Sequence, residues 1–332
     1  PRLHVLDNVD PYTISALLHG GLVDDARAWR DWVLCALAGR PENLQIMYGV
    51  TGQRRIDEYE LGALAGYEGS RPVRVGNAAY QQFQLGVYGE TMGAIFFAHQ
   101  RGVEIDAPAW DMIRILLDHV EAVWQEPDSG IWESRAEPRH YTHSKVLAWR
   151  AFDAAVQAVD DFGYEGPRER WKATADRIHA DVCARGFDAR RNAFVQSYGG
   201  DALDAAVLML PLVGFLPADD PRMRGTIAAL EIALLRDGLL YRTSADPETA
   251  AARPESEGAF LACNFWLVEN YALQGRTAEA RALFERLIGL ANDVGLLAEE
   301  YDPRRKRQVG NVPQTLSDGG LGNAAARLGA LH

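Results

Sequence analysis

The chain has 332 residues, of which 48% are apolar and 24% charged, and its formal net charge is -12 at pH 7. Such a length and balance are normal for a globular protein of one large domain or two ordinary ones. The acidic balance argues against nucleic acid as a partner, because phosphate binding needs clustered lysine and arginine, and the one basic run, at 304–307, is as short as a solvated loop.

Three cysteines stand far apart in the sequence, without the spacing of a metal site: Cys35, Cys183 and Cys263. Each lies in an apolar helical pattern, so we expect buried free thiols and a reducing compartment, the cytoplasm. No apolar run reaches the roughly 18 residues of a membrane span, and no signal peptide is visible, so no membrane partner is expected. The first residue is Pro1 rather than Met, which leaves an upstream segment open.

Helical periodicity dominates the sequence. Trp110, Ile113, Leu117, Val120 and Trp124, for example, recur every three or four residues and therefore share one helix face. In chain order, such patterns predict helices over residues 11–19, 24–38, 77–101, 107–125, 139–162, 168–185, 201–213, 221–236, 257–274, 277–292 and 314–330. Many of these segments end near a glycine and several begin near a proline, as helices commonly do.

The connections between these helices alternate between short and long. Residues 102–106 and 163–166 make short ones, whereas 40–75 and 238–256 make long ones. Long connections in a compact domain usually carry function. Helical hairpins joined in this way predict a closed ring of helix pairs whose long loops gather at one end. Because no linker or exact repeat interrupts the chain, we expect a single domain over residues 1–332.

Two glutamates stand in turn-rich segments between the helices. Glu133 ends the stretch 128–133 and follows Trp132, and Glu299 lies close to Tyr301 in the stretch 297–303. Two carboxyl groups brought into one site by loops are the minimum equipment for cleaving a glycosidic bond, one as acid and one as base. A chain with 46 acidic residues contains many chance pairs, so spacing alone does not select these two.

Six longer stretches of sequence distinguish Glu133 and Glu299 from the other acidic residues. These stretches are residues 44–49, 69–78, 130–133, 139–146, 257–261 and 298–302. In this order they resemble glycoside hydrolase family 15, which holds glucoamylases, glucodextranases and bacterial trehalase-like enzymes, and the resemblance runs from about residue 24 to 314. It implies an all-α fold, the (α/α)6 barrel, with an inner and an outer ring of six helices each. It also implies hydrolysis of α-glucosidic bonds from the non-reducing end, with inversion, to release β-glucose.

The resemblance assigns the roles of the two glutamates. Glu133 matches the general acid and Glu299 the general base. Inversion places the two carboxyl groups roughly 6.5–9.5 Å apart, which leaves room for the attacking water. Glu133 has to hold a proton near neutral pH, and burial against Trp132 favours the protonated form. Glu299 has to stay ionised to activate the water.

Further side chains are expected to bind the sugar by stacking or hydrogen bonding. They are Trp132, Tyr301, Arg71, Arg74, Arg139, His140, Lys145, Glu257, Glu300 and Asp10. Each has an ordinary structural alternative, which is lining the loop core for the aromatic rings and surface or capping contacts for the charged groups. The family uses no catalytic metal, so His140 and His143 are expected to form hydrogen bonds, and no metal or cofactor is expected. Asp204 falls in an inner-helix stretch.

The chain departs from the family first at its beginning. Bacterial members carry an N-terminal β-sandwich and then a first barrel helix, and both are absent here. About eleven of twelve helices are left, and an open ring would expose apolar helix faces. We therefore expect a second copy of the chain or a further N-terminal segment to close the barrel.

Two further departures concern the residues that bind the terminal glucose and the last helix. The family has an Arg-Asp pair before its second helix. This chain has no arginine between Arg2 and Arg27, and Asp10 would supply the carboxylate only if the alignment slips by one residue. Losing such a pair costs about a hundredfold in rate. In the last helix, Gly319, Gly320 and Gly322 replace bulkier residues and weaken it by about 1 kcal/mol each.

The leading interpretation is an inverting, exo-acting α-glucosidase of glucoamylase type acting on an α-glucosidic oligosaccharide or disaccharide. A trehalase, or a hydrolase of isomaltose or dextran, is an alternative within the same chemistry. A degenerate member that binds sugar or a partner with little or no turnover is a second alternative. Phosphorolysis and epimerisation on the same barrel are disfavoured, because neither needs this acid with this base.

Overall fold

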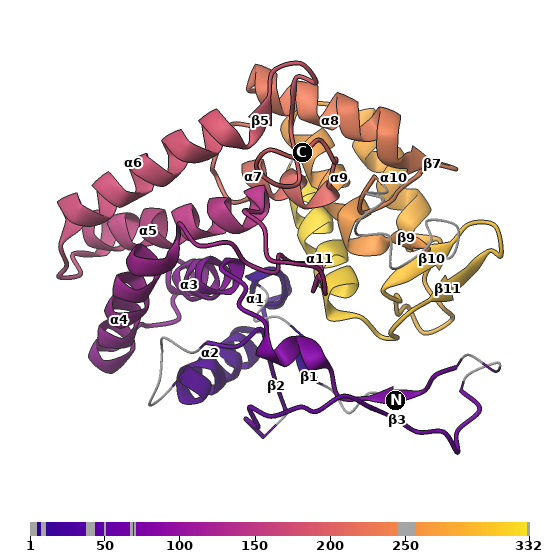
Figure 1. Ribbon diagram of the computed structural model, residues 1–332, viewed down its shortest axis with the longest axis horizontal. Coiled ribbons are helices and arrows are strands. Elements are labelled where there is room, and N and C mark those ends of the chain that lie inside the picture. The colour runs from indigo at the N-terminus through magenta and orange to yellow at the C-terminus, as the bar shows by residue number, and fades with distance from the viewer. Residues whose placement is uncertain are drawn as a thin grey trace.

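The computed structural model of the chain describes residues 5–7, 11–37, 44–49, 51–66, 69, 71–244 and 257–330, so Asp10 lies outside the described residues. Its helices are α1 (Pro11–His19), α2 (Val23–Leu37), η3 (a 3-10 helix, Ala78–Gln81), α3 (Gly86–His99), α4 (Ala107–Val123), α5 (Thr142–Phe162), α6 (Arg168–Arg185), η4 (3-10, Ala205–Leu208), α7 (Met209–Leu212), α8 (Pro221–Leu234), α9 (Leu261–Leu273), α10 (Thr277–Ile288) and α11 (Thr315–Gly329) (Figure 1).

Short strands connect these helices. They are β1 (Val5–Asp7), β2 (Met47–Gly49), β3 (Tyr59–Glu60), β4 (Arg74–Val75), β5 (Phe187–Asp188), β6 (Ala193–Phe194), β7 (Leu235–Arg236), β8 (Leu239–Leu240), β9 (Ala259–Phe260), β10 (Glu300–Asp302) and β11 (Arg307–Val309). Most pair as two-stranded antiparallel ribbons, and β11, β10 and β9 form one three-stranded sheet in that order. The strands stiffen loops, while the helices build the core.

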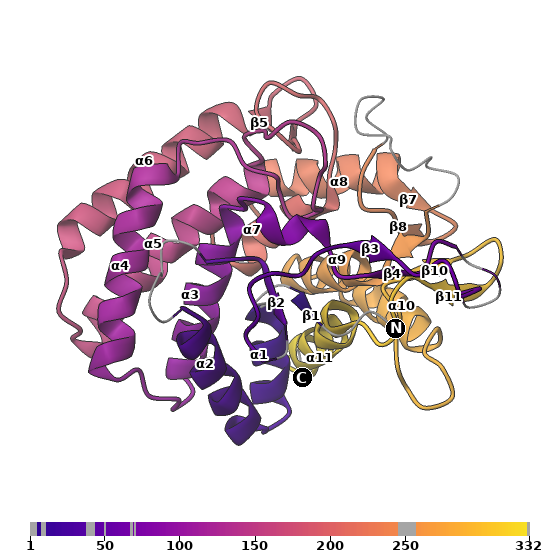
Figure 2. The same cartoon turned by 60° about the horizontal axis from the view of Figure 1, so that its bottom comes forward.

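The helices form a ring of pairs. On the inside, α1 packs against α3, α3 against α5, α9 against α11 and α11 against α1, while η4 and α7 fill the place between α5 and α9. Helices α2, α4, α6, α8 and α10 stand outside this ring, with α6 packed on α5 and α10 on α9 (Figure 2). This arrangement confirms the all-α (α/α)6 barrel, here with eleven α-helices in the described residues.

The expected opening between the two ends of the ring is not found among the inner helices. A Cβ atom on Gly322 of α11 would lie 3.1 Å from the Cβ of Ala16 in α1, and one on Gly320 would lie 3.0 Å from the Cβ of Phe265 in α9. The glycines of α11 therefore allow close packing on both neighbours, which offsets their low helix propensity. A second copy or an added segment is not needed to close the described inner ring.

The predicted helices agree with the structure within two residues except at four starts and at the end of segment 277–292, since α10 ends at Ile288. Segment 77–101 divides into η3 and α3, because the Asn77 side chain accepts from the amide of Ala79 and starts a separate turn. Segment 139–162 begins only at Thr142, and 257–274 only at Leu261, since the residues before them pair as a bridge or strand. Segment 201–213 is extended as far as Asp204, which caps η4 through its carboxylate.

All three cysteines are free, as expected, but only Cys263 is buried; Cys183 is half-buried and Cys35 on α2 is exposed. Helix α2 is an outer helix, and Cys35 lies on its solvent side despite the apolar pattern around it. Within the described segments, no helix combines the length and the apolar character that crossing a bilayer requires.

Two glycines of α3 provide a matched test of inner-ring packing. A Cβ atom on Gly89 would lie 1.8 Å from the carbonyl oxygen of Leu147 in α5, whereas one on Gly93 would meet nothing closer than 3.7 Å, at Arg150. We expect Gly89→Ala to destabilise the protein by about 2 kcal/mol or more, because backbone has to move. Gly93→Ala should instead stabilise it by about 0.5–1 kcal/mol. Urea unfolding of both variants measures the difference, and equal stabilities would contradict this packing.

Candidate active site

Glu133 lies in the loop between α4 and α5, and its backbone is left-handed, with φ at 52°. Asp128 holds the start of this loop, because one of its carboxylate oxygens accepts from the amides of Leu85 at 3.0 Å and Gly130 at 3.3 Å. Asp128 also exchanges both backbone hydrogen bonds with Arg139, each 2.9 Å long. Burial raises the pKa of Asp128 to about 6. Asp128 and Arg139 thus join the two ends of the loop, and Glu133 lies in the turn between them.

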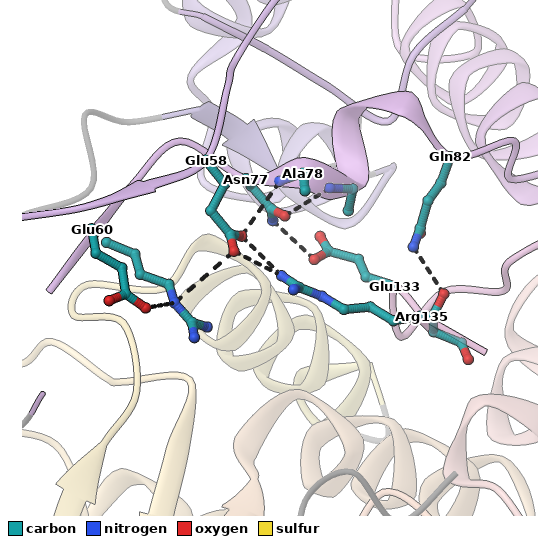
Figure 3. A network of polar contacts seen from close by, with 10 residues as sticks. Glu58, Glu60, Asn77, Ala78, Gln82, Glu133 and Arg135 are labelled. Carbon is teal, nitrogen blue, oxygen red and sulfur yellow. Dashed lines mark hydrogen bonds and ion pairs between the residues drawn. The ribbon is translucent and has the colours of Figure 1, made fainter. Parts of the chain in front are cut away.

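The carboxylate of Glu133 is held by an amide. The Nδ2 atom of Asn77 donates to Oε2 of Glu133 at 2.9 Å (Figure 3). The other amide atom of Asn77, Oδ1, accepts from the backbone of Ala79 at 3.0 Å, which fixes the orientation of the amide. Next to Glu133, the carbonyl of Ser134 accepts from Gln82 at 2.9 Å. Asn77 therefore contacts the carboxyl group itself, and Gln82 anchors the loop beside it.

Trp132, the residue before Glu133, is fixed by a buried carboxylate. Its indole N–H donates to both oxygens of Asp204 at 2.9 Å, and Gln196 donates to the same carboxylate at 2.9 Å. Burial raises the pKa of Asp204, while these donors favour its ionised form. The indole ring meets Phe260 edge-on, with centroids 5.4 Å apart. Trp132 therefore joins the Glu133 loop to the cap of η4 and to β9.

Glu299 lies directly before β10, in the loop between α10 and α11. Its carbonyl accepts from Leu261 at 3.0 Å, its amide donates to the carbonyl of Asn311 at 2.9 Å, and Oε2 accepts from the amide of Asn311 at 3.2 Å. A Cβ atom on Gly310 would lie 2.7 Å from Oε2 of Glu299, and Gly310 has a positive φ of 82°. A glycine at position 310 therefore gives the Glu299 carboxylate its space.

Arg242 connects the two loops. Its guanidinium forms an ion pair with Glu257 and lies over two aromatic rings, 4.7 Å from the centroid of Phe260 and 5.5 Å from that of Trp132. Burial raises the pKa of Glu257, the Arg242 charge opposes this rise, and the Glu299 charge adds to it. Arg242 and Phe260 thus link Trp132, the neighbour of Glu133, to β10, which begins directly after Glu299. No motif in the sequence singles out Arg242, which lies within the long connection 238–256.

Glu300 adds a third carboxyl group to those of Glu257 and Glu299. Its Oε2 accepts from the amide of Gly258 at 2.7 Å. Burial raises the pKa of Glu300 to about 7, and the negative charges of Glu257 and Glu299 act in the same direction. Near neutral pH, Glu300 therefore carries a proton for much of the time, which limits the negative charge gathered at this end of the site.

The raised pKa of Glu300 predicts a pH dependence of stability. Its ordinary value is 4.5, and the folded chain holds the proton up to about pH 7. The folded state thus binds more protons in this interval, so the contribution is complete below about pH 4.5 and is lost as pH rises to about 7. Glu300→Gln keeps an acceptor for Gly258 and should flatten this decline. Melting temperatures of both proteins at pH 5 and 8 test it, and a parallel decline would contradict it.

Lys145 is placed differently from the expectation. Its ammonium donates to the backbone carbonyls of Trp124, at 2.6 Å, and Glu126, and the side chain is buried. Burial lowers its pKa to about 8, although the Asp128 charge opposes this. Lys145 therefore ties the C-terminal end of α4 to the start of α5, and this role replaces the predicted contact with a sugar hydroxyl.

The other predicted residues lie at or around the two loops. Arg74 on β4 forms ion pairs with Glu60 at 3.7 Å and Glu58 at 4.0 Å. The ring of His140 stacks on Tyr198 with centroids 6.0 Å apart, and burial lowers its pKa.

Three of the remaining predicted residues differ in exposure. Arg71 is exposed and Arg139 half-buried at the base of the Glu133 loop, while Tyr301 packs from β10 against the core. Their roles in sugar binding stay predictions.

No group of three or more His, Cys, Asp or Glu side chains in the described residues is arranged to hold a metal ion. His143 is fully buried, and neither of its ring nitrogens has a hydrogen-bond partner there. Burial lowers its pKa to about 4, so it is neutral. His143 therefore packs in the interior beside α3, and the hydrogen bonds expected of it are not found among the described residues.

Known proteins resemble this chain over most of its length. The family model described as "Glycosyl hydrolases family 15" matches residues 7–325. A protein named trehalase from Mycolicibacterium smegmatis is 40% identical over 290 residues, which cover 87% of this chain and 43% of the relative. A trehalase from Thermoplasma acidophilum is 37% identical over 317 residues, covering 96% and 54%. The chain thus spans about half the length of these curated relatives.

Solved structures share the fold at lower identity. A glycosidase in complex with glucose superposes with a TM-score of 0.77 at 20% identity, covering 96% of this chain and 86% of that one. A bacterial glucoamylase complexed with acarbose gives a TM-score of 0.74 at 12% identity, covering 95% and 47%. At these identities the likeness concerns the barrel and not the substrate.

Proposed function

This chain belongs to glycosyl hydrolases family 15, and from that premise we propose that it hydrolyses an α-glucosidic bond with inversion, using Glu133 as general acid and Glu299 as general base. One observation carries the proposal. Arg242 lies over the rings of both Trp132 and Phe260, and Phe260 pairs in the sheet with Glu300, the residue after Glu299. Two glutamates more than 160 residues apart therefore serve one site.

The reaction divides between the two loops. Glu133 gives its proton to the glycosidic oxygen as the bond to the anomeric carbon breaks. On the opposite face of the sugar, Glu299 takes a proton from the water whose oxygen forms the new bond. The glucose released from the attacked unit is then the β anomer. Arg242 lies over the indole ring of Trp132, and we expect both groups to border the sugar.

For the substrate, we propose α,α-trehalose. The sequence favours a glucoamylase-type activity with a trehalase as one alternative, and the relatives named trehalase support that alternative. The structural neighbour named glucoamylase supports only the fold at 12% identity. Isomaltose and maltose are the competing substrates. Three free thiols support the cytoplasm as the proposed compartment.

An anomer-resolved assay tests this function. The protein is incubated with trehalose, isomaltose and maltose at pH 5 to 7, and the anomeric protons are followed by NMR before mutarotation. Inverting hydrolysis of trehalose should release α- and β-glucose in equal initial amounts, whereas retention would release the α anomer alone. No glucose from any of the three sugars, with a helical circular dichroism spectrum, would overturn the hydrolase and favour a sugar-binding member without turnover.

A further inference from the structure

We propose that Asn77 and Glu58 are positioning residues for the acid, with Asn77 holding the carboxylate of Glu133 and Glu58 binding the two chain segments that meet there. The proposal rests on the proposed role of Glu133. It concerns two residues that make no motif with Glu133 in the sequence, since they precede it by 56 and 75 positions. Figure 3 shows both of them beside the Glu133 loop.

Asn77 can present only a donor to Glu133. Its Oδ1 is occupied by the amide of Ala79 at 3.0 Å, so turning the amide would break that bond and face two acceptors toward one another. An N–H donor stabilises a carboxylate more than a carboxylic acid. The bond from Asn77 therefore strengthens as Glu133 gives up its proton, which is the moment when the glycosidic oxygen needs it.

Glu58 binds both sides of this contact. Its carboxylate accepts from the guanidinium of Arg135 at 2.9 and 3.1 Å, and from the amide of Ala78 at 3.4 Å. Ala78 follows Asn77, and Arg135 is two residues beyond Glu133. One side chain thus fixes the distance between the donor and the acid.

Glu58 is ionised at the pH of the reaction. Burial favours its neutral form, but Arg135, the amide of Ala78 and the charge of Arg74 together outweigh burial and hold the pKa of Glu58 below its ordinary value. The side chain of Glu58 is 16% exposed and that of Arg135 65% exposed, so solvent screens this ion pair in part.

The backbone conformation of Glu133 is one that surrounding contacts have to stabilise. A φ of 52° is unusual for glutamate and costs free energy, and it persists only where surrounding contacts impose it. Gln82 supplies a further contact, since it donates to the carbonyl of Ser134 at 2.9 Å. Gln82 anchors the same loop without touching the carboxyl group or Glu58, so it separates anchoring of the loop from control of the proton.

The test is the pH profile of trehalose hydrolysis in three variants. Asn77→Asp keeps the acceptor for Ala79 and replaces the donor by a like charge. We expect its alkaline limb of kcat/KM to move up by about one pH unit, with kcat about tenfold lower and KM within threefold. Glu58→Gln should lower kcat about threefold to tenfold, and should add nothing further in an Arg135→Gln background. Gln82→Leu should lower the melting temperature and leave the alkaline limb of kcat/KM at its wild-type pH.

The outcomes are distinguishable. If Glu133→Gln is inactive but Asn77→Asp has the wild-type profile, or if Gln82→Leu moves the limb as far, this proposal is overturned while the proposed function stands. If wild type and Glu133→Gln release glucose equally, the proposed function itself fails. Circular dichroism of each variant confirms that the barrel is folded, which the retained cap of Ala79 favours in Asn77→Asp.

Discussion

Glu133→Gln is expected to lower kcat for trehalose by about a thousandfold, because glutamine has no proton to give to the departing oxygen. Glutamine has nearly the same shape, and its carbonyl oxygen still accepts from Asn77, so the loop should keep its conformation. The loss therefore reports chemistry and not folding. Initial rates by coupled glucose detection measure it.

A change of substrate makes this test sharper. α-Glucosyl fluoride has a leaving group that departs with little help from an acid, so the Glu133→Gln variant should recover most of its activity on it. The matched control is Glu137→Gln, which removes an exposed carboxylate from the same loop and should stay within twofold of wild type. Equal losses on both substrates would contradict the role of Glu133 as acid.

Glu299→Gln is expected to lower kcat by a similar factor of about a thousand, on trehalose and on α-glucosyl fluoride alike, because the attacking water loses its base whichever group leaves. The glutamine oxygen can still accept from the amide of Asn311, and Gly310 leaves room for it. Rates on the two substrates, measured side by side, distinguish a base from an acid.

The control for Glu299→Gln is Asp302→Asn, three residues further along the chain at the end of β10. Asp302 caps the hairpin turn by accepting from the amides of Arg304 and Arg305, and asparagine keeps that acceptor. This variant should retain activity within about twofold. If Glu299→Gln were as active as Asp302→Asn, the base would have to be sought elsewhere among the described carboxyl groups, with Glu300 and Glu257 the first to be replaced.

Helix positions and the two loops could be predicted from the sequence because both signals are local. Apolar spacing identifies the buried face of a helix such as α4, and short motifs identify the turns that carry Glu133 and Glu299. The same reasoning placed Lys145 at a sugar and Cys35 in the interior. Both positions are decided by which neighbour the helix faces, and a pattern within one helix does not contain that information.

Contacts between distant segments decided the rest. The sequence by itself determined the barrel, its helix pairs and the two candidate catalytic glutamates, since periodicity and motif depend on neighbouring residues. Only the tertiary structure placed Arg242 over the ring of Trp132, the amide of Asn77 at the carboxylate of Glu133, and the carboxylate of Asp204 at the indole N–H of Trp132. These pairs are 56 to 110 residues apart, and their geometry exists only when the ring of helices brings the loops together.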